Sequence, residues 1–275
     1  MFRSITAILP LAAVLFAGCA GPGTRTPDYD IVIRHGLVID GSGSPGAPAD
    51  VAVRDGRIVA VGAAPGTART EIDATGKVVA PGFIDVHTHA EDIVDLPQAE
   101  NFLRMGVTTI VSGNCGMSNV DIAGYFEAIR NSRVSLNVAT LVGQGAIHAQ
   151  VMGGSFMRPP TASELDQMRQ LVAKAMQDGA VGLSTGLIYL PGTYTRTEEL
   201  VELAKVAAAH GGIYASHMRH ENTLIFEALE ELARISREAH IRAEVSHIKL
   251  SGPTAWGRTA EVAAFLDRAR AEGLD

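Results

Sequence analysis

Two histidines separated by one residue suggest a metal site in this chain. They lie in the segment Phe83-Ile-Asp-Val-His87-Thr-His89. On a β-strand, residues two apart point to the same side, so the imidazoles of His87 and His89 would face one metal ion together. A His-x-His pair by itself is as often part of a polar turn, so other residues must decide between the two interpretations.

Three further candidate ligands each follow a short apolar run. Thr-Ile-Val-Ser-Gly-Asn precedes Cys115, Ile-Tyr-Ala-Ser precedes His217, and Ala-Glu-Val-Ser precedes His247. Taken singly, a small buried cysteine or a hydrogen-bonded core histidine is the commoner interpretation. Taken together, one thiolate and four imidazoles at the carboxyl ends of parallel strands would converge on one rim. That donor set suits zinc.

The pattern from residue 81 onward predicts strands whose ends could meet. Short β-type runs, with helix-type segments between them, begin near Phe83, Val107, Val134, Val181, Ile213 and Ile241. The alternation favours a parallel sheet of about six βα units, either doubly wound or closed as a barrel, and the count alone does not choose. A (β/α)8 barrel needs eight units. If residues 81–275 form a barrel, two strands are absent, and we then expect an incomplete TIM-type barrel from a truncated sequence.

Two helices between these strands have recognisable ends. Thr161-Ala-Ser-Glu164 and Thr195-Arg-Thr-Glu198 have the spacing of capping boxes, and Gly211-Gly212 ends the second helix. Apolar residues at positions 200, 203, 204 and 207 predict one apolar stripe along that helix, facing the sheet.

The first eighty residues predict three segments. Residues 1–19 have a positive start, an apolar run and the small-residue exit Ala17-Gly18-Cys19, which indicates an export signal. The apolar run is shorter than the ~20 residues that a membrane-spanning helix needs. Residues 20–29 are rich in Gly, Pro and Thr and predict a linker. Residues 30–80 contain short β-branched runs and predict a small β-sandwich module.

The export signal resembles that of bacterial lipoproteins, in which the cysteine becomes the lipid-carrying first residue. We therefore expect a periplasmic protein anchored to the membrane through Cys19. The alternative is simple secretion, with Cys19 in the removed peptide.

Composition excludes several classes of protein. The chain has 275 residues, of which 47% are hydrophobic and 19% charged, and this is too apolar for a disordered protein. Lys and Arg total 23 against 30 Asp and Glu, and no basic cluster is present, so nucleic acid is not an expected partner. Only two cysteines occur, which excludes a disulfide-built scaffold.

Several segments along the chain together carry a family resemblance. They are Asp40-Gly-Ser-Gly, Ala80-Pro-Gly-Phe-Ile-Asp-Val-His-Thr-His-Ala-Glu91, Ser112-Gly-Asn-Cys-Gly116, Gly182-Leu-Ser-Thr-Gly-Leu-Ile-Tyr-Leu-Pro-Gly192, Ser216-His-Met-Arg-His-Glu221 and Val245-Ser-His-Ile-Lys249. With them the chain resembles the amidohydrolase superfamily and, within it, the D-aminoacylases, also called N-acyl-D-amino-acid deacylases. The cysteine in Ser-Gly-Asn-Cys-Gly and the Ser-His-Ile-Lys segment point to this branch.

The resemblance implies metal-dependent hydrolysis of the amide bond of N-acyl-D-amino acids, giving a D-amino acid and a carboxylic acid. His87 and His89 would hold a weaker metal ion, Cys115 would ligate at the junction of the two positions, and His217 with His247 would complete the tight Zn2+ site. The expected partner is therefore a small-molecule substrate, with the membrane contacted through the lipid anchor alone.

The resemblance also implies roles outside the metal ligands. Tyr189 matches a tyrosine that hydrogen-bonds the scissile carbonyl oxygen, and Lys249 matches a lysine that binds the substrate α-carboxylate. A loop aromatic and a surface lysine are the alternatives. In the family, an Asp at the end of the eighth strand moves the proton, and this chain ends before such a strand. Glu221 or Asp85 could be considered for that role, but nothing in the spacing favours either.

Other functions stay open on the sequence. One is hydrolysis of cyclic amides or of D-containing dipeptides, which substrate profiling would separate from deacylation. Another is a catalytically inactive zinc-binding fragment that lacks the Asp of the eighth strand.

Overall fold

The computed structural model describes residues 26–275 except residue 156. The chain divides into two compact units, with the boundary between Pro81 and Gly82. The predicted export signal with Cys19, and the first part of the predicted linker, lie outside the described residues. Among the residues that are described, no helix is long and apolar enough to cross a membrane.

The first unit is a single mixed sheet. Its strands are β1 (Tyr29–Val38), β2 (Ala47–Arg54), β3 (Arg57–Gly62), β4 (Ala68–Asp73) and β5 (Val78–Val79). β2 pairs antiparallel with β1 and β3, whereas β4 and β5 pair in parallel with β1. Asp55 and Gly56, both with positive φ, form the two-residue turn between β2 and β3, as the Asp-Gly sequence favours.

This arrangement corrects the expectation of a β-sandwich. β4 pairs with the first part of β1 and β5 with the last part, on either side of an irregularity between Ile33 and Gly36. Both strands therefore extend one sheet, and the five described strands of this unit belong to that single hydrogen-bonded sheet and not to two. The predicted linker also ends earlier than expected, because Tyr29 already belongs to β1.

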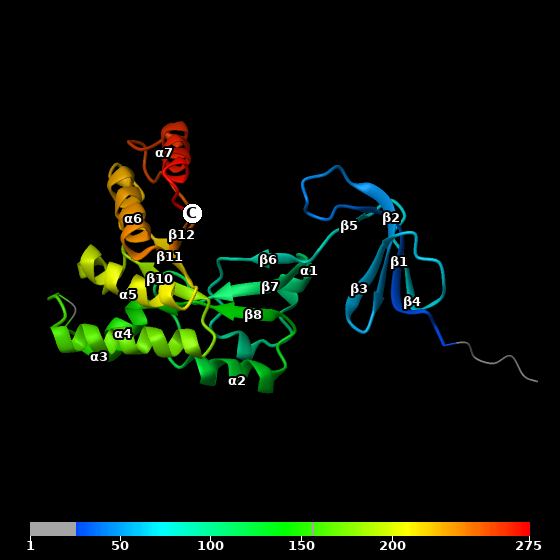
Figure 1. The fold of residues 1–275 in the computed structure, drawn as a ribbon, viewed down its shortest axis with the longest axis horizontal. Coiled ribbons are helices and arrows are strands. Elements are labelled where there is room, and N and C mark those ends of the chain that lie inside the picture. Colours follow the sequence, from blue (N-terminus) through cyan, green and yellow to red (C-terminus); the bar gives the residue numbers. More distant parts are fainter. Residues whose placement is uncertain (1–25, 156) are drawn as a thin grey trace, which may run out of the picture. The chain divides into compact units, whose positions relative to one another are not determined.

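The second unit is an incomplete α/β barrel, as predicted (Figure 1). Its strands are β6 (Phe83–Asp85), β7 (Val107–Ser112), β8 (Asn137–Thr140), β9 (Val142–Gly143), β10 (Gly182–Gly186), β11 (Ile213–His217) and β12 (Arg242–Val245). Neighbouring strands are parallel and follow chain order, from β6 to β8 in one sheet and from β9 to β12 in the other. Leu141 alone separates β8 from β9, so the strand expected near Val134 begins at Asn137 and passes from one sheet into the other.

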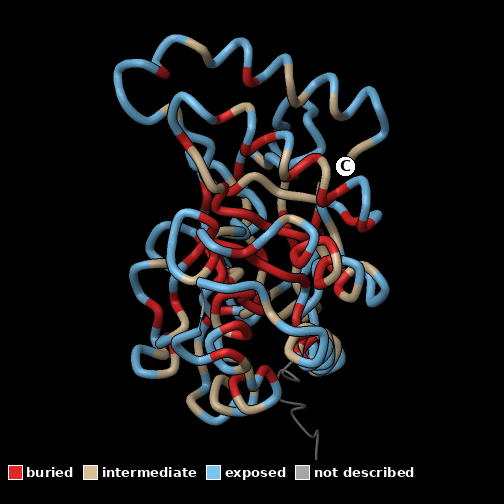
Figure 2. The backbone as a smooth tube through the Cα atoms, turned by 90° about the vertical axis from the view of Figure 1, so that its left-hand side faces the viewer, coloured by how far each residue is buried: buried red, intermediate tan, exposed pale blue. Residues whose placement is uncertain are grey.

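Helices connect these strands and cover the sheet. They are α1 (Glu100–Arg104), α2 (Ile122–Ser132), α3 (Gln144–Met152), α4 (Ala162–Gln177), α5 (Thr197–Ala209), α6 (Ile225–Ala239) and α7 (Thr259–Ala271), with short 3-10 turns at Ile93–Asp95 and Gly192–Tyr194. The predicted stripe of α5 is confirmed, since Leu200, Leu203, Ala204 and Ala207 are all buried. Figure 2 shows buried residues concentrated in the interior of this unit.

The two predicted capping boxes have different outcomes. At α4, the Thr161 hydroxyl accepts from the Glu164 N–H and the Glu164 carboxylate accepts from the Thr161 N–H, so this box is confirmed. The box predicted from Thr195 is wrong, because α5 begins at Thr197 and has no side-chain cap. The Thr195 hydroxyl instead accepts a hydrogen bond from Gln144 Nε2 at 3.0 Å.

Candidate metal centre

Four strand ends carry the candidate metal ligands. His87 follows β6, Cys115 follows β7, His217 is the last residue of β11, and His247 follows β12. In a parallel barrel the carboxyl ends of the strands lie on one rim, and TIM-barrel enzymes have their active sites at that rim. The fold therefore brings together side chains that are up to 160 residues apart in the chain (247 minus 87).

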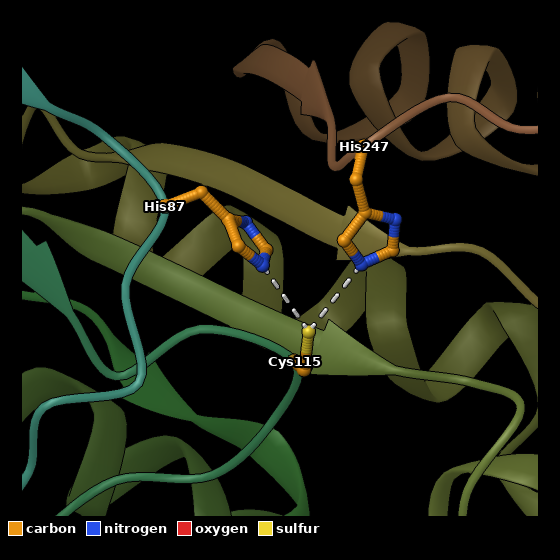
Figure 3. A group of neighbouring side chains, drawn as sticks. All are labelled: His87, Cys115 and His247. Carbon is orange, nitrogen blue, oxygen red and sulfur yellow. Dashed lines mark hydrogen bonds between the residues drawn. The ribbon is translucent and has the colours of Figure 1, made fainter.

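Cys115 lies at the centre of this cluster. Its Sγ is 3.6 Å from His87 Nε2, 3.6 Å from His217 Nδ1 and 3.8 Å from His247 Nε2. Figure 3 shows His87 and His247 directing their rings at the thiol. A sulfur and a nitrogen bound to one tetrahedral zinc ion, at about 2.3 and 2.0 Å, lie about 3.5 Å apart. The three sulfur–nitrogen distances are thus close to those between zinc ligands, and the ligand atoms of His87, Cys115 and His247 all lie within 4.8 Å of one another.

The loop that carries Cys115 is packed tightly against the next strands. Ser184 Oγ accepts from the Gly116 N–H at 3.1 Å and donates to the Gly113 carbonyl at 2.5 Å. A Cβ at Gly186 would lie 2.2 Å from the Cys115 carbonyl oxygen, so this approach requires glycine. Cys115 itself has φ +54°, a conformation that non-glycine residues adopt at a cost. Long-range packing therefore holds the thiol toward the histidines.

Burial sets the protonation of these groups. It raises the pKa of the Cys115 thiol to about 11 and lowers the pKa of His217 to about 4, with Glu221 opposing the second shift. The pKa of His87 is also lowered, by burial first and by the neighbouring His247 second. Neutral imidazoles keep a lone pair for a metal ion, and a buried thiol loses its proton readily only when a cation lies beside it. The donor set therefore fits a bound cation.

His89 lies outside the cluster around Cys115. It is exposed, its ring centroid is 5.5 Å from that of His87, and it belongs to neither group of potential ligand atoms within 4.8 Å of one another in the described residues. The prediction that both histidines face one side assumed a strand through residue 89. The strand β6 already ends at Asp85, His87 lies in the bend that follows, and His89 lies in irregular chain beyond it.

Tyr189 and Lys249 both lie beside the candidate ligands. The Tyr189 ring packs edge-on against His217 with centroids 4.7 Å apart, and half of the residue is exposed. Desolvation raises the pKa of the Tyr189 hydroxyl, which keeps it a hydrogen-bond donor at neutral pH. Lys249 Nζ is 2.7 Å from His247 Nδ1. Both residues can therefore reach a molecule bound over the cluster.

Glu221 is a site residue that sequence reasoning did not assign. Its side chain is 7% exposed, with Oε1 3.1 Å from His247 Nδ1 and Oε2 3.7 Å from His217 Nε2. Oε1 also accepts from Lys249 Nζ at 2.5 Å. The available signal was a carboxylate four residues after a histidine at a strand end. Asp85, considered alongside it, accepts from the backbone N–H of His87 at 3.2 Å.

Comparison with known proteins gives consistent matches. The Amidohydrolase family profile matches residues 78–248. The D-aminoacylase of Alcaligenes xylosoxydans xylosoxydans is 38% identical over 268 residues, covering 88% of this chain and 55% of that protein. The N-acyl-D-glutamate deacylase of the same organism is 39% identical over 270 residues, covering 90% and 55%.

A solved structure is similar to the same extent. The N-acyl-D-glutamate deacylase of Bordetella bronchiseptica, complexed with zinc and a phosphonate inhibitor that mimics the tetrahedral intermediate, superposes with a TM-score of 0.86. It is 38% identical, and the match covers 90% of this chain and 57% of that one. The chain thus spans about half the length of the curated relatives it matches.

Proposed function

This chain belongs to the amidohydrolase family, and from that premise we propose that the protein hydrolyses the amide bond of N-acyl-D-amino acids. The products would be a D-amino acid and a carboxylic acid. One observation carries the proposal, namely the approach of three imidazole nitrogens to Cys115 Sγ at 3.6–3.8 Å. The similarity to D-aminoacylase and to N-acyl-D-glutamate deacylase supports the choice of substrate class.

We infer that the ion held here is zinc. Cys115, His217 and His247 would form the tight position, as the sulfur–nitrogen distances of 3.6 and 3.8 Å support. His87 with His89 would form a weaker one that meets it at Cys115, from which His87 Nε2 is 3.6 Å away. A mixed thiolate and imidazole donor set favours zinc over magnesium or calcium. When bound, zinc supplies Lewis acidity to an amide carbonyl and lowers the pKa of a neighbouring water to about 7.

The protein's own side chains would orient the substrate. The Tyr189 hydroxyl, next to His217, would donate a hydrogen bond to the scissile carbonyl oxygen and stabilise the negative charge that develops on it. The Lys249 ammonium group, next to His247, would bind the substrate α-carboxylate. With one contact beside His217 and the other beside His247, an N-acyl amino acid would be held at both polar ends.

Glu221 is unsuited to moving the proton of the attacking water. Both of its carboxylate oxygens face histidine nitrogens on the side away from Cys115, and one also accepts from Lys249. A general base must reach the proton that it removes. We therefore assign Glu221 no acid/base role.

The test is stereochemical. Zinc-loaded protein is assayed with N-acetyl-D-amino acids and with their L-isomers, with D-hydantoins and D-dipeptides as further substrates. We expect hydrolysis of the N-acetyl-D compounds to dominate. Equal rates on the L-isomers would contradict the assignment of D-substrates, and faster turnover of the cyclic amides would favour the alternative hydrolase reaction.

We also propose that the protein is exported and anchored by a lipid on Cys19. The support is the sequence of residues 1–19, which lie outside the described part of the structure. Mass spectrometry of the mature N-terminus should find acyl groups on Cys19. An unmodified N-terminus beyond Cys19 would instead indicate simple secretion.

A further inference from the structure

The carboxylate of Glu221 spans the two histidines of the proposed tight site. We call His217 Nε2 and His247 Nδ1 the outer nitrogens, because the other nitrogen of each ring faces Cys115. Glu221 Oε2 faces the first at 3.7 Å and Oε1 faces the second at 3.1 Å. One buried side chain is therefore in contact with the outer side of both rings.

This placement bears on which ring nitrogen carries the proton. A neutral histidine that binds a metal ion through one nitrogen must carry its proton on the other. The outer N–H groups of His217 and His247 would then point at a carboxylate, which only accepts hydrogen bonds. His217 Nε2 is buried and makes no hydrogen bond in the described residues, so Glu221 Oε2 is the acceptor available to it. Glu221 thus favours the tautomers whose inner nitrogens can bind the ion.

Lys249 contacts both Glu221 and His247, so it affects which nitrogen of His247 carries the proton. Its Nζ is 2.7 Å from His247 Nδ1 and 2.5 Å from Glu221 Oε1. An ammonium group only donates, so in this contact Nδ1 accepts and the His247 proton sits on Nε2, the nitrogen that faces Cys115 and that could not then bind a metal ion. An ion on Nε2 requires the proton on Nδ1 instead, and Glu221 Oε1 is the acceptor within reach, because it lies 3.1 Å from Nδ1 and already accepts from Lys249, which holds the ammonium group beside the site.

We propose that Glu221 is a positioning residue that fixes the metal-binding tautomers of His217 and His247 and holds Lys249 ready for the substrate carboxylate. The inference rests on the proposed function, since it requires that the cluster binds a metal ion. Carboxylates that orient ligating histidines in this way typically change metal affinity or activity about 10- to 100-fold when they are removed.

The first test measures zinc affinity of the intact protein by competition with a chromophoric chelator. Glu221→Gln keeps the size of the side chain but replaces one acceptor oxygen by a donor NH2, and we expect a loss of affinity of about 10- to 100-fold. Glu231→Gln is the matched control, because Glu231 is 13% exposed and its carboxylate pairs with Arg219. Zinc affinity of the control should stay within about twofold of wild type. Unchanged affinity in Glu221→Gln would overturn the proposal.

The second test uses the wild-type protein, so it does not depend on a variant that folds. Nitrogen-15 NMR of labelled histidines in the zinc-loaded protein should show His217 protonated on Nε2 and His247 protonated on Nδ1. The opposite tautomer at either residue would overturn the proposal.

Steady-state kinetics give the third readout. Glu221→Gln should raise KM for an N-acetyl-D-amino acid more than for the corresponding amide, which lacks the carboxylate that Lys249 binds. Equal changes in KM would contradict the role toward Lys249. Failure of wild-type protein to hydrolyse any N-acyl-D-amino acid, while zinc affinity still depends on Glu221, would refute the proposed function and support this inference.

Discussion

The two histidine pairs of the site are held in different ways. His87 and His89 come from one segment, their ring centroids are 5.5 Å apart, and His89 is exposed. His217 and His247 come from neighbouring strands, their rings are 4.4 Å apart, and both contact Glu221. Closeness in sequence therefore does not bring the rings of His87 and His89 together, whereas the ends of two neighbouring strands bring His217 and His247 together around Glu221.

Cys115 links the two pairs, so its removal should have the largest effect. In Cys115→Ser the hydroxyl is a much poorer zinc ligand than a thiolate, and the variant should lose bound zinc on dialysis. We expect kcat/KM for N-acetyl-D-amino acids to fall by more than about 100-fold, beyond the range for outer partners of metal ligands. Metal analysis and activity assays measure both. A serine variant that keeps zinc and turnover would show that the thiol is not a ligand.

Among the ring contacts of the described residues, Tyr189 packs against one of the two pairs, through His217. Tyr189→Phe removes the hydroxyl and leaves the ring, so zinc affinity should stay unchanged while kcat falls about 100- to 1000-fold, as for a lost oxyanion donor. Tyr194→Phe, in the same loop, is the control and should change kcat far less. Similar losses in the two variants would indicate a general disturbance of the loop.

His89→Ala tests the weaker pair directly. Because His89 lies outside the group around Cys115, the variant should keep one tightly bound zinc ion and lose any second, weaker one. Activity should fall by less than about 10-fold, below the usual effect of outer partners. Titration with zinc, followed by metal analysis, counts the sites. Loss of the tightly bound ion would instead show that the tight site needs His89 as it needs His217.

His148 is a buried histidine outside the candidate metal centre. It is 2% exposed in α3, its Nδ1 makes no hydrogen bond in the described residues, and burial lowers its pKa. A depressed pKa means that the unfolded chain binds more protons as pH falls below about 6.5, so the folded state loses stability in acid. Well above pH 6.5 the ring is neutral in both the folded and the unfolded chain, so no stability is lost there.

The expected result for His148 is the smallest of the four. In chelator-treated protein, urea unfolding should show a free energy of unfolding that declines from pH 7 toward pH 5, and His148→Gln should decline less steeply. His35→Gln, at an exposed position, is the control. Equal slopes in wild type and His148→Gln would mean that burial of this ring does not contribute to the acid sensitivity.

Much of the barrel could be predicted because its signals are local. β-Branched runs and helix caps act over a few residues, so each predicted strand was found, and α4 has its predicted capping box. The sandwich and the second box failed because non-local pairing overrode them. β4 and β5 both joined β1, and the Thr195 hydroxyl bonded Gln144 instead of a helix end.

Residue type and position after a strand were enough to select Cys115, His217 and His247 as candidates, because the donor chemistry belongs to the side chain itself. Packing between distant segments decided the rest. It determines which ring nitrogens face the thiol, it leaves His89 outside the cluster around Cys115, and it brings Glu221 into contact with His217 and His247. These depend on bends after the strands, where Cys115 and His247 have positive φ. Such conformations persist only where the surrounding structure holds them, and no local pattern encodes that support.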